Sequence, residues 1–161
     1  MKHDTTDTTD ADVTVTVHVD ATQQRAFDVF TTGFGTWWPM QHHIGAQDAV
    51  DAVIEPHAGG RWFERAADGT ECEWGSVLEW DGPDRIVLAW HLNPEFEYDP
   101  DPAFATQVEV RFIVEGPTST RVELTHRGFE VFGEPGAAMR TAVSSPDGWG
   151  GILRGYAAKA A

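Results

Sequence analysis

The stretch from Gly59 to Leu92 limits the possible folds of this chain more than any other part of it. Residues 61–65 are short and aromatic, and residues 72–80 alternate apolar and polar side chains with the period of a half-buried β-strand. Residues 85–92 form a further strand segment, with Ile86, Leu88, Trp90 and Leu92 on one face. Tight turns rich in glycine and proline separate the segments, so the stretch is predicted to form an antiparallel meander. Its tryptophans create an apolar surface that another layer of structure must cover: Trp62, Trp74, Trp80 and Trp90.

Residues 72–80 show the alternation most clearly. One face would carry Cys72, Trp74, Leu78 and Trp80, and the other would carry glutamates. Such a pattern is typical of a strand that is buried on one side. Cys72 is the single cysteine of the chain, which excludes an intramolecular disulfide and a cysteine-based zinc cluster. We interpret it as a small core residue because its neighbours on the same face are apolar.

The remaining segments predict further strands and one early helix. Valines alternate with polar residues over residues 13–19, which predicts a first strand. A helix should follow it, because Asp20 or Thr22 can cap the helix and Ala26, Phe27 and Phe30 form one apolar stripe. Three more strands are predicted at residues 50–55, 106–115 and 121–129, the last two as a hairpin.

A terminal helix is predicted from Ser145, where serine, proline and aspartate follow one another as they do at many helix starts. The spacing of one helix face recurs at Trp149, Ile152, Leu153 and Tyr156. The predicted fold class is therefore α+β, with a curved antiparallel sheet of about seven strands wrapped around a long C-terminal helix. Such a sheet would leave a cavity between itself and the helix.

Residues 1–11 are rich in threonine and aspartate, without an apolar anchor, and we expect a disordered tail there. Residues 12–161 are long enough to form a single domain with its own core. No apolar run approaches the roughly 20 residues that a membrane span needs. The N-terminal residues do not resemble a signal peptide either, so a cytoplasmic location is expected.

The formal net charge is −15, from 11 basic and 26 acidic residues. This balance opposes binding to nucleic acid or to an anionic membrane, because phosphate groups need lysine and arginine to neutralise them. Two interpretations of the acidity remain open. One is a salt-adapted proteome, and the other is the solvated acidic surface of a protein from a GC-rich genome.

Two loops carry residues that are unusual for solvent-exposed connections. The segment from Gly33 to Gly45 contains Trp37, Trp38, His42 and His43. The loop at residues 93–104 contains three prolines and four acidic residues, and loops of this length are often functional. We hypothesise that the tryptophans of the first loop close the mouth of the cavity opposite the second loop.

The histidines are the candidates for chemistry. His126 is in phase with Val122 and Leu124 and should point inward, either as a neutral histidine bonded within the core or as an anchor or general base at the cavity wall. Adjacent residues seldom ligate one metal ion, because their side chains diverge, so no metal site is predicted at His42 and His43. The conceivable further ligands would be Glu55, His57 and His91.

This order of elements and several short motifs resemble the SRPBCC superfamily, also called START-like or birch-pollen-allergen-like, with its helix-grip fold. Within that superfamily, the chain resembles homologues of the C-terminal domain of the activator of the heat-shock-protein-90 ATPase. The resemblance covers about residues 12–160. The matching motifs are Glu55-Pro56, Gly59-Gly60-Arg61-Trp62, Gly75-Ser76-Val77-Leu78-Glu79, Pro83-Asp84-Arg85-Ile86-Val87-Leu88 up to Trp90, Arg121-Val122-Glu123-Leu124-Thr125-His126, Gly128-Phe129 and Gly148-Trp149.

The resemblance implies a scaffold whose members bind hydrophobic or amphipathic small molecules, and such binding is our first hypothesis. The alternative is a cavity enzyme of the cyclase, dehydratase or hydrolase type, with His126 or His42 as acid or base. A third interpretation is a chaperone-interacting module, which would display an exposed apolar patch. The chain is expected to be a monomer or a homodimer without a cofactor or metal. The candidate ligand-binding residues are Trp37, Trp38, His42, His43, Trp74, Trp90, Phe112, His126 and Trp149.

Overall fold

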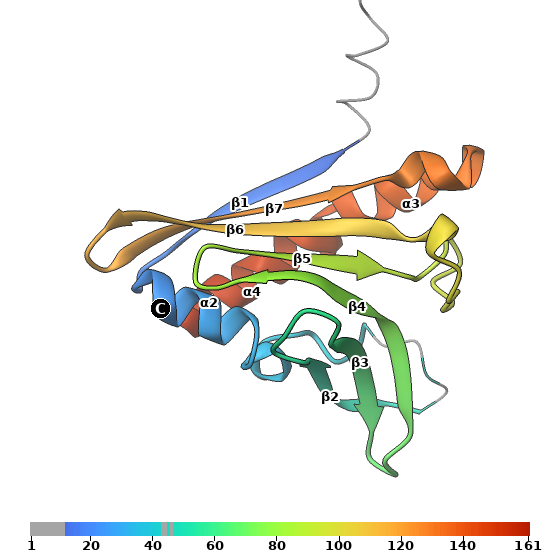
Figure 1. Ribbon diagram of the computed structural model, residues 1–161, viewed down its shortest axis with the longest axis horizontal. Coiled ribbons are helices and arrows are strands. Elements are labelled where there is room, and N and C mark those ends of the chain that lie inside the picture. The colour runs from blue at the N-terminus through green and yellow to red at the C-terminus, as the bar shows by residue number, and fades with distance from the viewer. Residues whose placement is uncertain (1–11, 43–44, 46) are drawn as a thin grey trace, which may run out of the picture.

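The computed structural model describes residues 12–42, 45 and 47–161, so the tail predicted at residues 1–11 lies outside the described residues. In the described part, seven strands form an antiparallel sheet in the order β1-β7-β6-β5-β4-β3-β2. The sheet is curved, and β2 and β3 turn away from the plane of the long central strands (Figure 1). The strands are β1 (Val13–Val19), β2 (Ala49–Ile54), β3 (Arg61–Ala66), β4 (Glu71–Asp81), β5 (Arg85–Trp90), β6 (Thr106–Gly116) and β7 (Ser119–Arg127).

Three helices pack against one face of this sheet (Figure 1). They are α2 (Gln23–Phe30), α3 (Glu134–Ser144) and α4 (Gly151–Ala160). Short helical turns lie between the larger elements: η1 (Phe34–Thr36), η2 (Pro102–Phe104), η3 (Phe129–Phe132) and η4 (Pro146–Gly150). The curved antiparallel sheet with a C-terminal helical region confirms the predicted α+β helix-grip fold.

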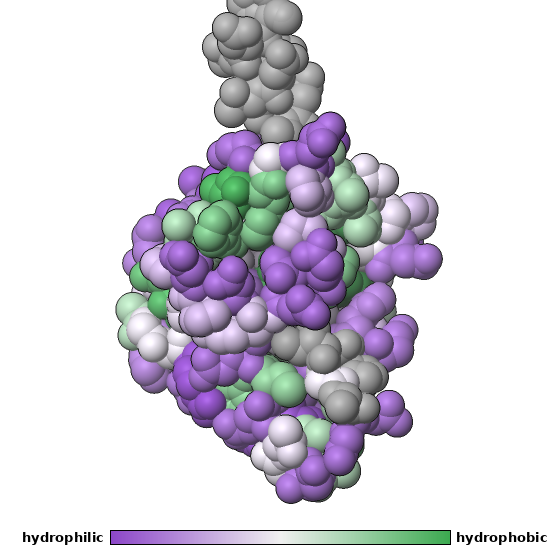
Figure 2. Space-filling view, turned by 90° about the vertical axis from the view of Figure 1, so that its right-hand side faces the viewer, coloured by the Kyte–Doolittle hydropathy of each residue, from purple (hydrophilic) through white to green (hydrophobic). Residues whose placement is uncertain are grey.

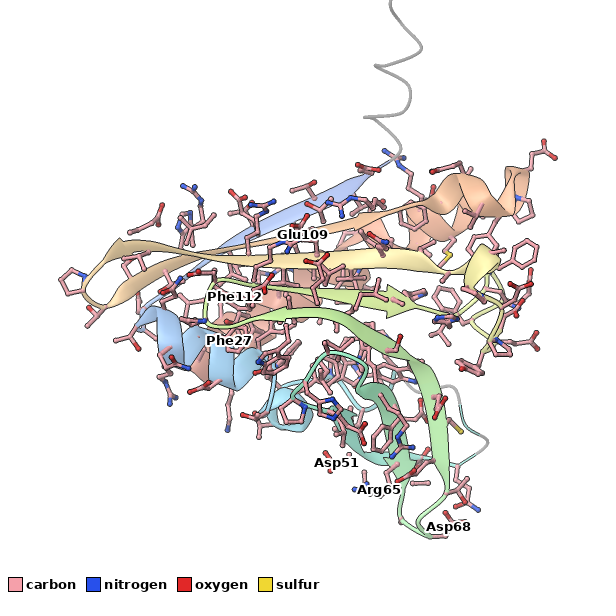
Figure 3. The ribbon with its side chains drawn as sticks, in the orientation of Figure 1. Phe27, Asp51, Arg65, Asp68, Glu109 and Phe112 are labelled. Carbon is pink, nitrogen blue, oxygen red and sulfur yellow. The ribbon has the colours of Figure 1, made fainter. Side chains whose placement is uncertain are left out.

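Helix α2 begins as its sequence predicts. The hydroxyl oxygen of Thr22 accepts a hydrogen bond from the backbone N–H of Arg25, at 3.2 Å, and so satisfies one donor that the first helical turn leaves free. The apolar stripe of the helix is buried, and Phe27 packs edge-on against Phe112 of β6, with 5.2 Å between ring centroids. Figure 3 places these two phenylalanines side by side where α2 meets the sheet.

Two irregularities in the meander change which side chains point inward. The pairing register of β4 shifts against β3 at Trp74 and against β5 at Leu78. A β-bulge of this kind adds a residue on one strand and reverses the inward and outward sides beyond it. As a result Val77 is buried, whereas Leu78 is 44% exposed, so the predicted inward orientation of Leu78 is wrong. The predicted core residue Cys72 is only half-buried, and burial raises the pKa of its thiol.

The C-terminal region differs from the prediction at its start. Helix α3 precedes Ser145 and was not predicted. Ser145 is extended and its hydroxyl donates a hydrogen bond to the carbonyl oxygen of Ala142, at 2.7 Å, so it does not cap the next helix. A turn of π-helix follows, with Gly148 in a non-helical conformation. A Cβ atom at Gly148 would overlap the carbonyl oxygen of Val143, and this explains why glycine occupies the break.

Candidate functional site

A cavity of about 360 Å³ lies between the sheet and the C-terminal helical region. Its inner wall consists of buried apolar side chains: Trp38, Trp74, Trp90, Leu92, Trp149 and Ile152. They come from the segment after η1, from β4, from the end of β5 and the residues just beyond it, from η4 and from the first turn of α4. Because these segments lie far apart in the sequence, the cavity exists only when the sheet and the terminal helices are both in place.

The rim of the cavity is more polar than its interior. Exposed or half-exposed residues surround the opening: Gln41, His42, Phe96, Ala142, Ser145 and Asp147. Phe96 belongs to the loop between β5 and β6 and has a positive φ of 61°, which is uncommon for a bulky residue. The side-chain oxygen of Asn93 holds this loop, because it accepts hydrogen bonds from the backbone N–H groups of Glu95, at 3.0 Å, and Glu97, at 2.9 Å.

The four tryptophans of the wall line the cavity, and three of them donate their indole N–H groups to other parts of the protein. The indole N–H groups of Trp38, Trp74 and Trp149 donate to the carbonyl oxygen of His42 at 3.2 Å, to Glu64 at 2.9 Å and to His126 at 3.1 Å. The indole N–H of Trp90 is buried and has no acceptor in the part of the chain that the structure describes. The interior of the cavity therefore consists mainly of aromatic surface, and three of its four indole N–H groups are already used within the protein.

Glu64 connects the wall to the rim. Glu64 lies on β3 and is buried, with only 2% of its surface exposed. One carboxylate oxygen accepts from the indole of Trp74, and the other accepts from the backbone N–H of Gly45, at 3.1 Å. Glu64 thus fixes the ring of Trp74 and anchors the segment that carries Trp38 and His42 to the sheet. The sequence contains a signal for this role, because Glu64 follows Trp62 and Phe63 in a short apolar strand. A carboxylate that is buried in such a strand needs hydrogen-bond partners.

His126 lies one layer behind the wall. It is fully buried on β7, its Nδ1 accepts from the indole of Trp149 at 3.1 Å, and its Nε2 lies 2.7 Å from the hydroxyl oxygen of Thr106. Because an indole N–H can only donate, Nδ1 must be unprotonated and the proton resides on Nε2. His126 therefore orients the Trp149 ring while remaining neutral, and burial lowers its pKa from the usual 6.5 to about 3.

This lowered pKa predicts a pH-dependent stability. Below pH 6.5 the unfolded chain takes up a proton at His126 that the folded chain does not bind until about pH 3, so the stabilisation is lost across that interval. We expect the stability advantage of wild type over His126→Asn to shrink by up to roughly 1.4 kcal/mol per pH unit below pH 6.5, measured by urea unfolding. Asparagine is chosen because its side-chain oxygen can still accept a hydrogen bond from the indole N–H of Trp149, while the side chain does not titrate. A stability difference that stays constant from pH 7 to pH 4 would contradict this assignment.

The structure gathers some of the predicted site residues and separates others. Around the cavity it brings together Trp38, His42, Trp74, Trp90 and Trp149. Trp37 lies in the core, where its ring packs on Phe30 and Tyr156, and Phe112 lies at the α2 end of the sheet (Figure 3). His126 contacts the wall from behind, and His43 lies outside the described residues. The roles of these residues in binding remain predictions.

Several lining residues were missed from the sequence. Ala142 and Val143 belong to α3, although Glu134-Pro135 carries the acidic and proline signals of a helix start and Met139 and Val143 are spaced as one helix face. Asp147 and Gly148 were assigned to a regular helix. Phe96 belongs to the loop that was expected to lie at the mouth, but no pattern distinguishes it from the neighbouring loop residues that do not line the cavity.

The residues that the structure describes contain no group of three or more His, Cys, Asp or Glu side chains that could hold a metal ion. Glu55 instead accepts from the backbone N–H of Arg61 at 2.7 Å, and Nδ1 of His91 lies 2.9 Å from the carbonyl oxygen of Asp99. None of the described helices is long and apolar enough to cross a membrane.

The sheet, the terminal helices and the enclosed cavity define a helix-grip protein of the SRPBCC, or START-like, class. Within this class the chain belongs to the family described as Activator of Hsp90 ATPase homolog 1-like protein, which matches residues 20–155. No curated protein matches the chain.

Two solved structures are identical to this chain at about a third of the aligned residues. The anthrahydroquino-gamma-pyrone synthase Txn09, complexed with SUM, is 35% identical with a TM-score of 0.65, and the match covers 91% of this chain and 95% of that chain. CalC from Micromonospora echinospora, a self-sacrificing resistance protein, is 32% identical with a TM-score of 0.66, over 92% of this chain and 93% of that chain. An HSP90 activator from Plasmodium falciparum shares the fold alone, at 19% identity and a TM-score of 0.50 over 72% and 71% of the two chains.

Proposed function

We propose that the protein binds a small hydrophobic or amphipathic molecule with a flat aromatic ring system in the cavity between the sheet and the C-terminal helices. The observation that carries this proposal is the wall formed by Trp38, Trp74, Trp90 and Trp149. Stacking and edge contacts between aromatic rings contribute about 0.5–1.5 kcal/mol beyond the burial of apolar area. A wall of four indoles therefore favours an aromatic ligand over a branched aliphatic one.

The size of the cavity restricts the ligand further. A volume of about 360 Å³ lies near the lower end of the range of roughly 300–1,000 Å³ that small-molecule sites span. The buried part of the ligand should then correspond to about three fused rings, with any larger substituent outside the mouth. The relative at 35% identity is a synthase named after an anthrahydroquino-gamma-pyrone, which is a fused aromatic ring system, and this supports the same ligand class here.

The alternative is a cavity enzyme, and the identity of 35% with a synthase is the observation in its favour. His126 is poorly suited to act as its base, because both ring nitrogens are engaged and a pKa of about 3 makes it a weak base. His42 is the histidine at the rim, where a substrate group can reach it. An enzyme of this kind would depend on His42 or on Asp147 rather than on His126.

Partners and location remain predictions that accompany the proposal. Contact with a chaperone receives no support from the activator of 19% identity, because a match at that level concerns the fold alone. The aromatic cavity favours a small molecule as the partner. A cytoplasmic location, a monomeric or homodimeric state and a single domain over residues 12–161 complete the proposal.

A fluorescence titration tests the proposed function. We expect 2-(hydroxymethyl)anthraquinone, a neutral molecule of three fused rings, to quench the tryptophan emission in a saturable manner, with one molecule bound per chain by calorimetry. The physical reason is that the ring system would lie against four of the seven tryptophans. Native mass spectrometry of gently purified protein would identify a natural ligand that co-purifies. Quenching that rises linearly without saturation would refute binding of flat aromatic molecules in the cavity.

A further inference from the structure

The two ends of the cavity differ in their chemistry. The inner wall is aromatic and aliphatic, and the indole N–H groups of its tryptophans are either bonded to the protein or buried. The polar side chains gather at the rim. Among the lining residues that the structure describes, Asp147 is the one acid, and none is lysine or arginine. The neutral interior thus opens through a mouth that carries a negative charge.

The surroundings of the mouth strengthen this asymmetry. Residues 26–60 and 86–110, which supply the rim residues Gln41, His42 and Phe96, contain no lysine or arginine. The loop between β5 and β6 adds four carboxylates, from Glu95, Glu97, Asp99 and Asp101. This loop and α3 lie at the end of the sheet that faces the viewer in Figure 2, where hydrophilic side chains border patches of apolar ones.

The carboxylates of the mouth are not neutralised by ion pairs. Over the described residues, ion pairs join carboxylates elsewhere on the sheet to arginines, but none involves Asp147 or the acids of the β5–β6 loop. Within the described part of the chain, Asp147 at the mouth and the four acids of the neighbouring loop thus have no ion-pair partner.

Negative charge at the mouth favours a ligand with positive charge over one with negative charge. A cleft lined by charge of one sign with walls of low dielectric constant concentrates the field and raises the local concentration of oppositely charged molecules. The net charge of −15 acts in the same direction. Indole rings add to this preference, because the face of an aromatic ring attracts a cation. An anionic group at the mouth would meet repulsion from Asp147, and no arginine or lysine is among the described lining residues.

We infer that the cavity takes a flat aromatic molecule that carries a cationic group, such as an ammonium, at the end that faces the mouth. The inference rests on the proposed function and adds to it the charge and the orientation of the ligand. The ring system lies among the tryptophans, and the ammonium lies beside Asp147. A substituent beyond the ammonium extends into solvent past the β5–β6 loop.

Three anthraquinones with the same ring system and different charge test this inference. They are 2-(aminomethyl)anthraquinone, which is cationic at pH 7, the neutral 2-(hydroxymethyl)anthraquinone and the anionic anthraquinone-2-carboxylate. We expect affinity for the wild-type protein to fall in that order at low salt. Asp147→Asn should weaken binding of the cation by about two- to fivefold relative to binding of the neutral compound, as expected for one exposed ion pair. Added salt should reduce the difference between the three compounds.

A matched variant controls for the loss of one charge. Asp20→Asn also removes a carboxylate, but in the turn between β1 and α2, at the opposite end of the sheet from the β5–β6 loop (Figure 1). We expect it to leave all three affinities unchanged. If the neutral compound binds and the cation binds no more tightly than the anion, the inference is overturned and the proposed function stands. If none of the three binds, the proposed function fails and the inference with it.

Discussion

Ending the chain at Ser145 is expected to abolish cooperative folding. The truncation removes η4 and α4, and with them four large side chains that are buried against the sheet: Trp149, Ile152, Leu153 and Tyr156. Burial of such side chains contributes about 1.5–3 kcal/mol each, and their sum is comparable to a typical net stability of roughly 5–15 kcal/mol. The shortened chain should therefore show no sharp thermal transition by circular dichroism.

A point variant in the full chain provides the control for this truncation. The hydroxyl of Tyr156 donates to the carbonyl oxygen of Ala26 at 2.6 Å, while its ring packs on Phe30 and Trp37. Tyr156→Phe keeps the packing and loses one hydrogen bond, so it should cost only about 0.5–1.5 kcal/mol and fold cooperatively. A truncated chain that retained a sharp transition would show that α4 is dispensable and would refute the helix-grip account of stability.

Ala142→Trp is expected to lower the affinity for the neutral anthraquinone at least tenfold. Ala142 lines the cavity from the exposed side of α3, so an indole there can occupy the mouth without being forced into the core. A ligand that must displace this indole loses contacts along its whole edge, and a loss of about 1.4 kcal/mol already corresponds to tenfold weaker binding. Calorimetry with 2-(hydroxymethyl)anthraquinone measures the effect.

The same helix offers a matched control for this variant. Ala137 is also exposed on α3 but does not line the cavity, so Ala137→Trp adds the same side chain to the same helix. It should bind the anthraquinone with the affinity of wild type. Equal loss of affinity in both variants would indicate a general effect on α3, and no loss in either would place the ligand outside the cavity.

Much of the fold could be predicted from the sequence because its strands follow simple rules. Alternation at residues 13–19 and 72–80 and the turn residues between segments locate the strands within one or two residues of the observed ones. The errors arise where the period is broken. The bulge at Leu78 reverses its orientation, and Gly148 interrupts what reads as one continuous helix. Neither irregularity leaves a periodic signal, because each depends on how neighbouring strands or helices fit together.

The site was predictable to a lesser degree. Tryptophan and histidine are unusual in a loop that contains glycine and proline, and this led to the prediction of Trp38 and His42 as site residues. Both line the cavity. The same reasoning selected Trp37, which lies in the core because successive residues of this turn point in different directions. Whether an inward aromatic ring fills the core or forms a wall depends on volumes that several segments share. Periodicity within one segment contains no information on such volumes.

A structure of the protein with 2-(hydroxymethyl)anthraquinone bound is the most direct test of the central claim. The account predicts the ring system between Trp38, Trp74, Trp90 and Trp149, with the hydroxymethyl group toward Asp147. The main competing position is the exposed surface where the rings of Phe104 and Phe132 stack, with 6.4 Å between their centroids. A ligand bound on that surface, with the cavity empty, would contradict the account.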